Sequence, residues 1–335
     1  MTHFNALVLD FQENNNLIAT IKKQTRQDLS PGDVLIKVAY SSVNYKDALA
    51  SQQNSGVVRQ YPLIPGIDLS GTVIDPGSSQ FKVGQNVLVT GYGLGVSHSG
   101  GYSEFAQVPQ EWIVPIPEGL DLKTVMVLGT AGLTAALSIN ALERQGLRQH
   151  PEARILVTGA SGGVASLAIG MLKKMGYHNI TALSRKKNLA SDYFKELGIS
   201  KVITPDELAT DTVRPLMAQN YDFILDTVGG KQLELLLPQI AYDGSISLCG
   251  NAGGIAFETT VLPYILRGIS ILGIDSVNIS PERRLYIWNR LAHDMLPDLL
   301  EKTTLAELSL DELPDAFQQL LSGKMTGRYL VKLTD

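Results

Sequence analysis

Short apolar runs separated by Pro-Gly turns dominate the first third of the chain. Between residues 4 and 122, runs rich in valine, isoleucine and leucine recur, for example over 34–38 and 87–90. Runs of this kind are typical of β-strands, and Pro-Gly is a typical turn sequence. The pattern therefore predicts a mainly β region, punctuated by Pro-Gly turns at 31–32, 65–66 and 76–77.

The pattern changes after Leu122, where apolar runs alternate with helical segments. Arg154–Thr158 (RILVT) is largely apolar without alternation, as expected of a strand that is buried on both faces. Alternating strands and helices predict a parallel sheet with helices on both faces, and six strands suit two mononucleotide-binding halves. The six predicted strands are 154–158, 179–183, 201–203, 221–226, 244–249 and 269–275.

The last 60 residues or so lie outside this six-strand set. A helix is predicted to begin near Pro281, because proline suits a first helical turn. A second helix follows over 311–321, and a closing strand over 328–333. These elements form either a helical tail on the second region or a return of the chain to the first; their spacing does not decide between the two.

Composition narrows the class of protein. A chain of 335 residues predicts two folded units, and 44% hydrophobic with 18% charged residues gives each an ordinary core. The net charge of −5 comes without any basic run, so we expect a small-molecule substrate rather than nucleic acid or a membrane. The N-terminus lacks export features and we see no apolar run of 18 residues, which favours the cytoplasm. The single cysteine, Cys249, excludes an internal disulfide, and we expect a buried small residue there rather than a nucleophile.

The first strand of the second region leads into a glycine-rich turn. Ser161-Gly162-Gly163-Val164 follows Arg154–Thr158 and precedes a helical stretch that ends near Met175. Glycines there let the backbone approach a pyrophosphate, whose charge is met by amide groups and by the positive end of the helix. Strand, glycine turn and helix together predict a dinucleotide-binding site.

The end of the second strand should indicate which dinucleotide is bound. An acidic residue there would hold the ribose hydroxyls of NAD, but the chain has Ser184-Arg185-Lys186. A hydroxyl and cations can bind the 2′-phosphate of NADPH, which a carboxylate would repel. We therefore expect NADPH; the alternative is a basic, solvated loop.

Residues 66–71 (GIDLSG) resemble the Gly-His-Glu-x-x-Gly segment of the zinc alcohol dehydrogenases in the medium-chain superfamily. Ile67 stands where those enzymes have a zinc-binding histidine, and Asn44, three residues before Asp47, stands where they have a ligand cysteine. An amide and an isoleucine cannot hold zinc, so we expect no metal.

Within the zinc-free branch, the chain resembles the YhdH/YhfP group, described as quinone oxidoreductases and including acrylyl-CoA reductase. The resemblance is carried by blocks at 42–50 (SVNYKDALA), 64–72 (IPGIDLSGT), 129–134 (GTAGLT), 157–164 (VTGASGGV), 226–229 (DTVG) and 327–328 (GR). Ala165 and Ser-Arg-Lys depart from the group's usual glycine and Ser-Gly-Arg.

This resemblance implies an α/β fold with a GroES-like β domain, residues 1–122 completed by 277–335, and a Rossmann domain with a doubly wound six-stranded sheet, residues 123–276. It also implies cofactor contacts at Tyr45, Ser161, Gly162, Gly163, Val164, Ser184, Arg185, Lys186, Lys201, Asn251, Ile265, Ser276 and Arg328.

Without a metal, the natural hydride acceptor is an alkene conjugated to a carbonyl, or a quinone. Asn44 and Tyr45 are candidate polar contacts to substrate and nicotinamide, and Asp47 a candidate for orienting them or relaying a proton. Each has a structural alternative: Asn44 as a turn cap, Tyr45 as a cofactor wall, Asp47 as an anchor for backbone amides. For Arg328, a phosphate or CoA contact competes with a surface ion pair.

Three functions stay open: NADPH-dependent reduction of an enoyl thioester or enone, NADPH:quinone oxidoreduction, and NADPH binding without catalysis. We also expect a homodimer. The strand over 269–275 should be the edge strand of the second sheet, and it is apolar and lacks lysine or proline, so its free edge would pair with a second copy.

Overall fold

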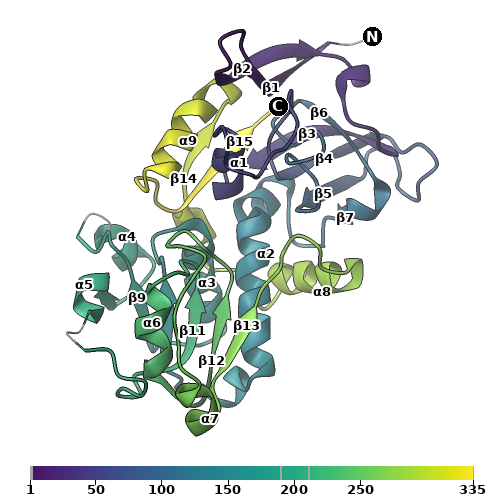
Figure 1. Cartoon of the computed structure of the whole chain (residues 1–335). Coiled ribbons are helices and arrows are strands. Elements are labelled where there is room, and N and C mark those ends of the chain that lie inside the picture. Colours follow the sequence, from purple (N-terminus) through teal and green to yellow (C-terminus); the bar gives the residue numbers. More distant parts are fainter. Residues whose placement is uncertain (1–2, 189–190, 210–211, 335) are drawn as a thin grey trace. The chain divides into compact units, whose positions relative to one another are not determined.

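The computed structural model describes residues 3–188, 191–209 and 212–334 (Figure 1). The chain divides into two compact units. The first comprises Met1–Ala131, Val277–Ala292 and Thr304–Asp335, and the second Gly132–Ser276 and His293–Thr303. These bounds differ from the expected domains, since residues 123–131 pack in the first unit and residues 293–303 in the second.

The first unit is built on a seven-stranded sheet in the order β14-β15-β3-β4-β5-β7, with β6 also paired to β3, and on a separate hairpin of β1 and β2. The closing strand β15 pairs antiparallel with β3, Leu330 lying opposite Ser42, so the chain returns to this unit. The strands are β1 (Phe4–Phe11), β2 (Leu17–Gln24), β3 (Val34–Ser42), β4 (Asp68–Asp75), β5 (Asn86–Thr90), β6 (Phe105–Val108), β7 (Val114–Pro115), β14 (Thr304–Leu308) and β15 (Arg328–Lys332).

Three short helices belong to the first unit: α1 (Tyr45–Ala50), α8 (Pro281–Ala292) and α9 (Leu313–Leu321). The predicted helix start at Pro281 is confirmed, and the helix predicted over 311–321 is α9 preceded by a 3-10 turn. Further 3-10 turns lie at Arg26–Asp28 and Gln110–Trp112.

The second unit contains a six-stranded parallel sheet in the order β10-β9-β8-β11-β12-β13 (Figure 1). All six predicted strands are present, although β12 begins at Ile240 rather than at Gly244. This order is that of a doubly wound Rossmann sheet, which confirms the predicted fold class. The strands are β8 (Ile155–Thr158), β9 (Ile180–Leu183), β10 (Lys201–Ile203), β11 (Tyr221–Asp226), β12 (Ile240–Leu248) and β13 (Ser270–Gly273).

Five helices belong to the described part of the second unit besides the end of α2 (Leu122–Arg144). The central strands β8 and β11 are almost wholly buried, as expected for strands of a parallel sheet that is covered on both faces. Gly176, with φ of 92°, ends α3 as predicted. The helices are α3 (Gly163–Lys174), α4 (Ser191–Glu196), α5 (Pro205–Leu208), α6 (Gln232–Leu236) and α7 (Leu262–Arg267), with 3-10 turns at Leu147–Gln149, Leu237–Gln239 and Leu300–Thr303.

The long helix α2 (Leu122–Arg144) contains a kink at Gly129, whose φ of 52° and ψ of −155° are not helical. The expectation that no apolar run reaches 18 residues needs correction here. An 18-residue window of α2 has a mean hydropathy of 1.7, enough by length and composition to cross a membrane. Because 89% of that window is buried inside the protein, we assign α2 as a core helix.

Candidate active site

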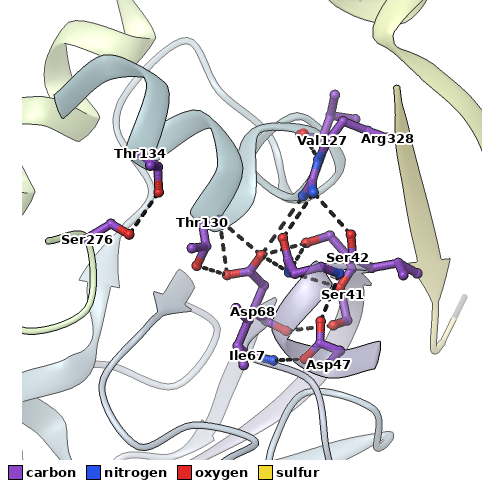
Figure 2. A network of polar contacts seen from close by, with 12 residues as sticks. Ser41, Ser42, Asp47, Ile67, Asp68, Val127, Thr130, Thr134, Ser276 and Arg328 are labelled. Carbon is purple, nitrogen blue, oxygen red and sulfur yellow. Dashed lines mark hydrogen bonds and ion pairs between the residues drawn. The ribbon is translucent and has the colours of Figure 1, made fainter. Parts of the chain in front are cut away.

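The first unit holds Asp47 at the start of α1, in a buried polar network (Figure 2). Asn44 precedes the helix with extended backbone, and its N–H donates to Asp47 Oδ2 at 2.9 Å, as in a capping box. Asp47 Oδ2 also accepts from the Tyr102 hydroxyl at 3.0 Å, and Oδ1 accepts from the Ile67 N–H at 2.9 Å. Asp47 thus ties α1 to the start of β4 and to Tyr102.

The environment of the Asp47 carboxyl group favours its protonated form. Burial, and then the charge of Asp68, raise the pKa of Asp47 to about 7. The Tyr102 hydroxyl also lies 3.1 Å from the Ser42 carbonyl oxygen. Since a hydroxyl has one hydrogen, Tyr102 can donate to Ser42 while it accepts from a protonated Asp47. Both side chains are fully buried, so this proton is enclosed.

Asp68, at the start of β4, is the acceptor at the centre of the network. Its carboxylate accepts from Ser42 Oγ at 2.6 Å, from Asn44 Nδ2 at 2.8 Å, and from both the hydroxyl and the N–H of Thr130, at 2.5 Å and 3.0 Å. Thr130 restarts α2 directly after the Gly129 kink. The carboxylate therefore accepts from the Thr130 amide, which the kink would otherwise leave without an acceptor.

Arg328 is buried against the same carboxylate. Its side chain is 4% exposed, its Nε donates to the Val127 carbonyl at 3.1 Å, and its Nη1 donates to Asn44 Oδ1 at 3.0 Å and to the Val43 carbonyl at 3.2 Å. Its Nη2 lies 4.0 Å from Asp68 Oδ2 and has no hydrogen-bond partner among the residues that the structure describes. Burial lowers the pKa of Arg328, opposed by the charge of Asp68. The alternative of a surface ion pair is therefore wrong, because Arg328 is an interior cation.

These contacts separate the three predicted catalytic residues. The Asn44 amide accepts from Arg328 and donates to Asp68 and to Ser42, so its hydrogen-bonding capacity is used within the protein. Asp47 is likewise enclosed. Tyr45, the first residue of α1, is 41% exposed. The network therefore brings Asn44 and Asp47 together beneath a helix start that presents Tyr45.

The positions that resemble zinc ligands do not fit a metal. Ile67 is buried and offers no donor atom, and the Asn44 amide is already bound by Arg328 and Asp68. Across the described part of the chain, no group of three His, Cys, Asp or Glu residues comes together as a metal site. Zinc needs thiolate, imidazole or carboxylate ligands that converge on one point, and these two positions do not supply them.

The second unit carries the predicted dinucleotide turn between β8 and α3. Gly159 has φ of 59°, and a side chain there would lie 2.4 Å from Thr227 Oγ1. Gly162 caps α3, and a Cβ there would lie 3.2 Å from the Gly159 carbonyl oxygen. The turn thus needs glycines for close backbone approach, and the positive end of α3 lies directly after it. Its geometry fits a bound pyrophosphate.

The end of β9 lies beside this turn. Ser184 is buried, and its hydroxyl donates to Ser161 Oγ at 3.3 Å and accepts from the Lys186 N–H at 3.1 Å. Arg185 is exposed, while burial, and then the charge of Arg185, lower the pKa of Lys186. Lys187 instead pairs with Glu207 at 2.7 Å. The two predicted cofactor segments are therefore adjacent, with Arg185 and Lys186 at their edge.

Two further predicted contacts follow strands at the carboxyl edge of this sheet. Asn251 follows β12 and is exposed. Ser276 follows β13, and its hydroxyl accepts from Thr134 Oγ1 at 2.8 Å. Lys201 is the exposed first residue of β10.

Ile265 lies elsewhere. It is 69% exposed on α7, a helix labelled in Figure 1. Arg267 anchors α7, because its Nη1 donates to the carbonyl of Ile240, the first residue of β12. The glycine turn lies at the carboxyl end of β8, so the whole length of the parallel strands separates it from α7. The structure does not bring Ile265 to the other predicted contacts of this unit.

Sequence analysis missed four residues of the first network: Ser42, Tyr102, Gly129 and Thr130. Asp68 was noted only within the GIDLSG segment. Three of the four lie in the sequence blocks that carried the family resemblance, and those blocks were the signal that could have found them. No spacing rule links the four residues to one another. They meet through the pairing of β3 with β4 and through the kink in α2.

Comparison with known proteins places both units in one family. Residues 30–118 match the alcohol dehydrogenase GroES-like domain, and residues 163–290 match the zinc-binding dehydrogenase domain. The chain is 45% identical over 313 residues to YhfP of Bacillus subtilis, provisionally described as a quinone oxidoreductase, covering 93% of this chain and 94% of that protein. It is 40% identical over 329 residues to the acrylyl-CoA reductase AcuI of Ruegeria pomeroyi, covering 98% of each.

Two solved structures of similar proteins have the same fold as this chain. The crystal structure of Bacillus subtilis yhfP with NAD bound superposes with a TM-score of 0.95 at 45% identity, covering 99% of this chain and 100% of that one. Escherichia coli K-12 YhdH with bound NADPH superposes with a TM-score of 0.92 at 42% identity, covering 98% and 100%. The chain therefore belongs to the quinone oxidoreductase-like group of the medium-chain dehydrogenase/reductase family.

Proposed function

We propose that this chain is an NADPH-dependent oxidoreductase that reduces a carbon–carbon double bond conjugated to a carbonyl, with acrylyl-CoA or a similar enoyl thioester or enone as substrate. The observation that carries this proposal is the similarity to acrylyl-CoA reductase AcuI over 98% of both chains. The network around Asp68, which leaves no metal-binding donor set at the positions that resemble zinc ligands, supports it.

The second unit would hold NADPH through the turn at 161–164 and the cationic end of β9. Backbone amides at Gly162 and Gly163 would face the pyrophosphate, at the positive end of α3. Arg185 and Lys186 would bind the 2′-phosphate, while Lys187 stays paired with Glu207. NADPH in the YhdH structure supports this choice, and NAD in the yhfP structure is consistent with the same pyrophosphate turn.

Bound NADPH supplies a hydride, which an alkene conjugated to a carbonyl accepts at its β-carbon. Negative charge then develops on the carbonyl oxygen and must be met by a hydrogen-bond donor. Among the three predicted catalytic residues, Tyr45 has the exposed side chain and would be this donor. Asn44 and Asp47 would act as positioning residues that fix the start of α1. Because Asp47 is enclosed, the proton for the α-carbon would come from solvent or from Tyr45.

Quinone reduction is the second candidate, favoured by the description of YhfP. A quinone would use the same cofactor site and would also not need a metal. NADPH binding without catalysis is the third.

A substrate panel tests the proposal. NADPH oxidation by the purified protein would be followed with acrylyl-CoA, a simple enone and a soluble quinone, and the reduced product counted against NADPH consumed. We expect one saturated product per NADPH with acrylyl-CoA, and a lower kcat for Tyr45→Phe with little change in NADPH affinity. Turnover of the quinone alone would favour the second candidate, and tight NADPH binding without any turnover would favour the third.

A further inference from the structure

Asp226 is a buried carboxylate in the second unit that the proposed reaction does not use. It is the last residue of β11, at the carboxyl edge of the sheet, and has no exposed surface. Its Oδ1 accepts from the Thr158 hydroxyl at 2.6 Å, and its Oδ2 accepts from the Gly229 N–H at 2.7 Å. It therefore joins the ends of β8 and β11, directly before the glycine turn.

The contact with Thr158 extends to the turn itself. The Thr227 N–H donates to Thr158 Oγ1 at 2.9 Å, and the Thr227 hydroxyl donates to the Thr158 carbonyl at 2.9 Å. Gly159, the next residue, packs so closely on Thr227 that a Cβ would lie 2.4 Å from its hydroxyl oxygen. The Asp226–Thr158 hydrogen bond is thus linked to the glycine turn through Thr227.

A third strand end is tied to the same residue. The N–H of Cys249 donates to the main-chain carbonyl of Asp226 at 3.0 Å, and the Cys249 thiol donates to it at 3.2 Å. The Asp226 side chain reaches the loop after this strand end through Gly229, from whose N–H it accepts and where a Cβ would lie 2.7 Å from the Gly250 carbonyl oxygen. A side chain at Gly250 would lie 1.9 Å from the Thr227 carbonyl oxygen, so the loop that leads to Asn251 also packs on this cluster.

Holding a carboxylate here costs stability. Burial raises the pKa of Asp226, and among the described residues the groups that act against this rise are hydrogen-bond donors rather than a cation. A buried charge without a counter-ion is unfavourable unless several donors meet it. An amide of the same shape would avoid that charge, but it offers one acceptor oxygen where Asp226 offers two.

We propose that Asp226 is a positioning residue for cofactor binding: it fixes the glycine turn at 159–163 and the loop at 249–254 in the arrangement that receives the pyrophosphate. This inference rests on the proposed function. Because the pyrophosphate is common to both cofactors, Asp226 sets affinity for NADPH and NADH alike, whereas Arg185 and Lys186 discriminate between them.

The test is Asp226→Asn, with dissociation constants measured by titration calorimetry for NADPH, NADH and adenosine 2′-monophosphate. We expect a loss of affinity of roughly tenfold for NADPH and by the same factor for NADH, the scale of one lost hydrogen bond. Adenosine 2′-monophosphate, which lacks the pyrophosphate, should bind as to the wild type. Unchanged NADPH affinity in a folded variant would overturn the inference. A wild-type protein that binds no NADPH would instead overturn the proposed function.

Asp222→Asn is the matched control. Asp222 lies on the same strand at its amino end, where it pairs with Arg154 at 2.7 Å, across the same β8–β11 contact. We expect this change to lower stability and leave all three dissociation constants unchanged.

If Asp226→Asn does not fold, the variants Thr158→Val and Thr158→Ser test the same hydrogen bond from its donor side. The valine removes the donor to Asp226 and should weaken the binding of both cofactors. The serine keeps the hydroxyl and should bind both cofactors with the affinity of the wild type. Equal affinity in the two variants would overturn the inference.

Discussion

Loss of the proton from Asp47 should make the first unit less stable as the pH rises. The carboxyl group is fully buried beside Asp68, and its pKa is raised to about 7. In the unfolded chain it would titrate near its ordinary value of 3.8. Between these two values the folded protein binds more protons than the unfolded chain. The resulting stabilisation is fully present below the unfolded pKa and is lost as the pH rises through about 7.

The size of this effect follows from the two pKa values. Each pKa unit between the folded and unfolded states corresponds to about 1.36 kcal/mol. The rise from 3.8 to about 7 therefore gives an upper limit of about 4 kcal/mol. We expect the free energy of unfolding to fall by up to this amount between about pH 4 and about pH 8. Asp47→Asn has no proton to release and should lack this part of the pH dependence.

Urea unfolding followed by tryptophan fluorescence suits this measurement. The two tryptophans, Trp112 and Trp288, both lie in the first unit, so the signal reports that unit. The pH dependence of other groups is shared by wild type and Asp47→Asn and cancels in their difference. If the two proteins show the same slope across neutral pH, Asp47 is not protonated in the folded state and the reasoning is refuted.

Four further outcomes are expected. Arg185→Ala and Lys186→Ala should each raise the KM for NADPH by about 1.5 to 3 kcal/mol in RT ln KM, with little effect on the KM for NADH. The control Lys187→Ala should change neither KM, and equal use of both cofactors by the wild type would contradict the assignment. Gly129→Ala should destabilise the first unit by about 2 to 4 kcal/mol in denaturant titrations, because the backbone conformation at this position favours glycine and the added Cβ would lie 2.6 Å from Asp68 Oδ2. A loss of stability below about 0.5 kcal/mol would argue against strain at this position. Ile271→Lys, on the edge strand β13, should shift the proposed homodimer toward monomer in sedimentation velocity, and a wild type that is already monomeric at micromolar concentration would end that proposal. Dialysis against a chelator should leave activity intact, and stoichiometric zinc in elemental analysis together with loss of activity would count against a metal-free site.

The fold of the second unit followed from local patterns. Apolar runs such as Arg154–Thr158 identify strands buried on both faces, and the glycine turn after the first of them identifies the cofactor edge, because both depend on residues close together in sequence. The place of residues 184–186 beside the turn was predictable for the same reason, because the end of the second strand lies beside the turn in any Rossmann sheet. Their contacts to the cofactor stay a prediction.

The first unit was less accessible. Its strands could be predicted, but their spacing left two interpretations for the last segment of the chain, and the return that the family resemblance implied is shown by the pairing of β15 with β3. Apolar periodicity is a property of one segment, and it says nothing about which distant segment supplies the partner strand.

Residue types at Asn44 and Ile67 already predicted that these two positions offer no zinc ligand, since ligand chemistry depends on side-chain identity. What each polar residue does was decided by the tertiary structure. Arg328 looked like a surface cation or a phosphate contact, yet it lies in the interior against Asn44 and close to Asp68. The free energy of a charged group depends on burial and on partners that are distant in sequence, and only folding brings those partners together.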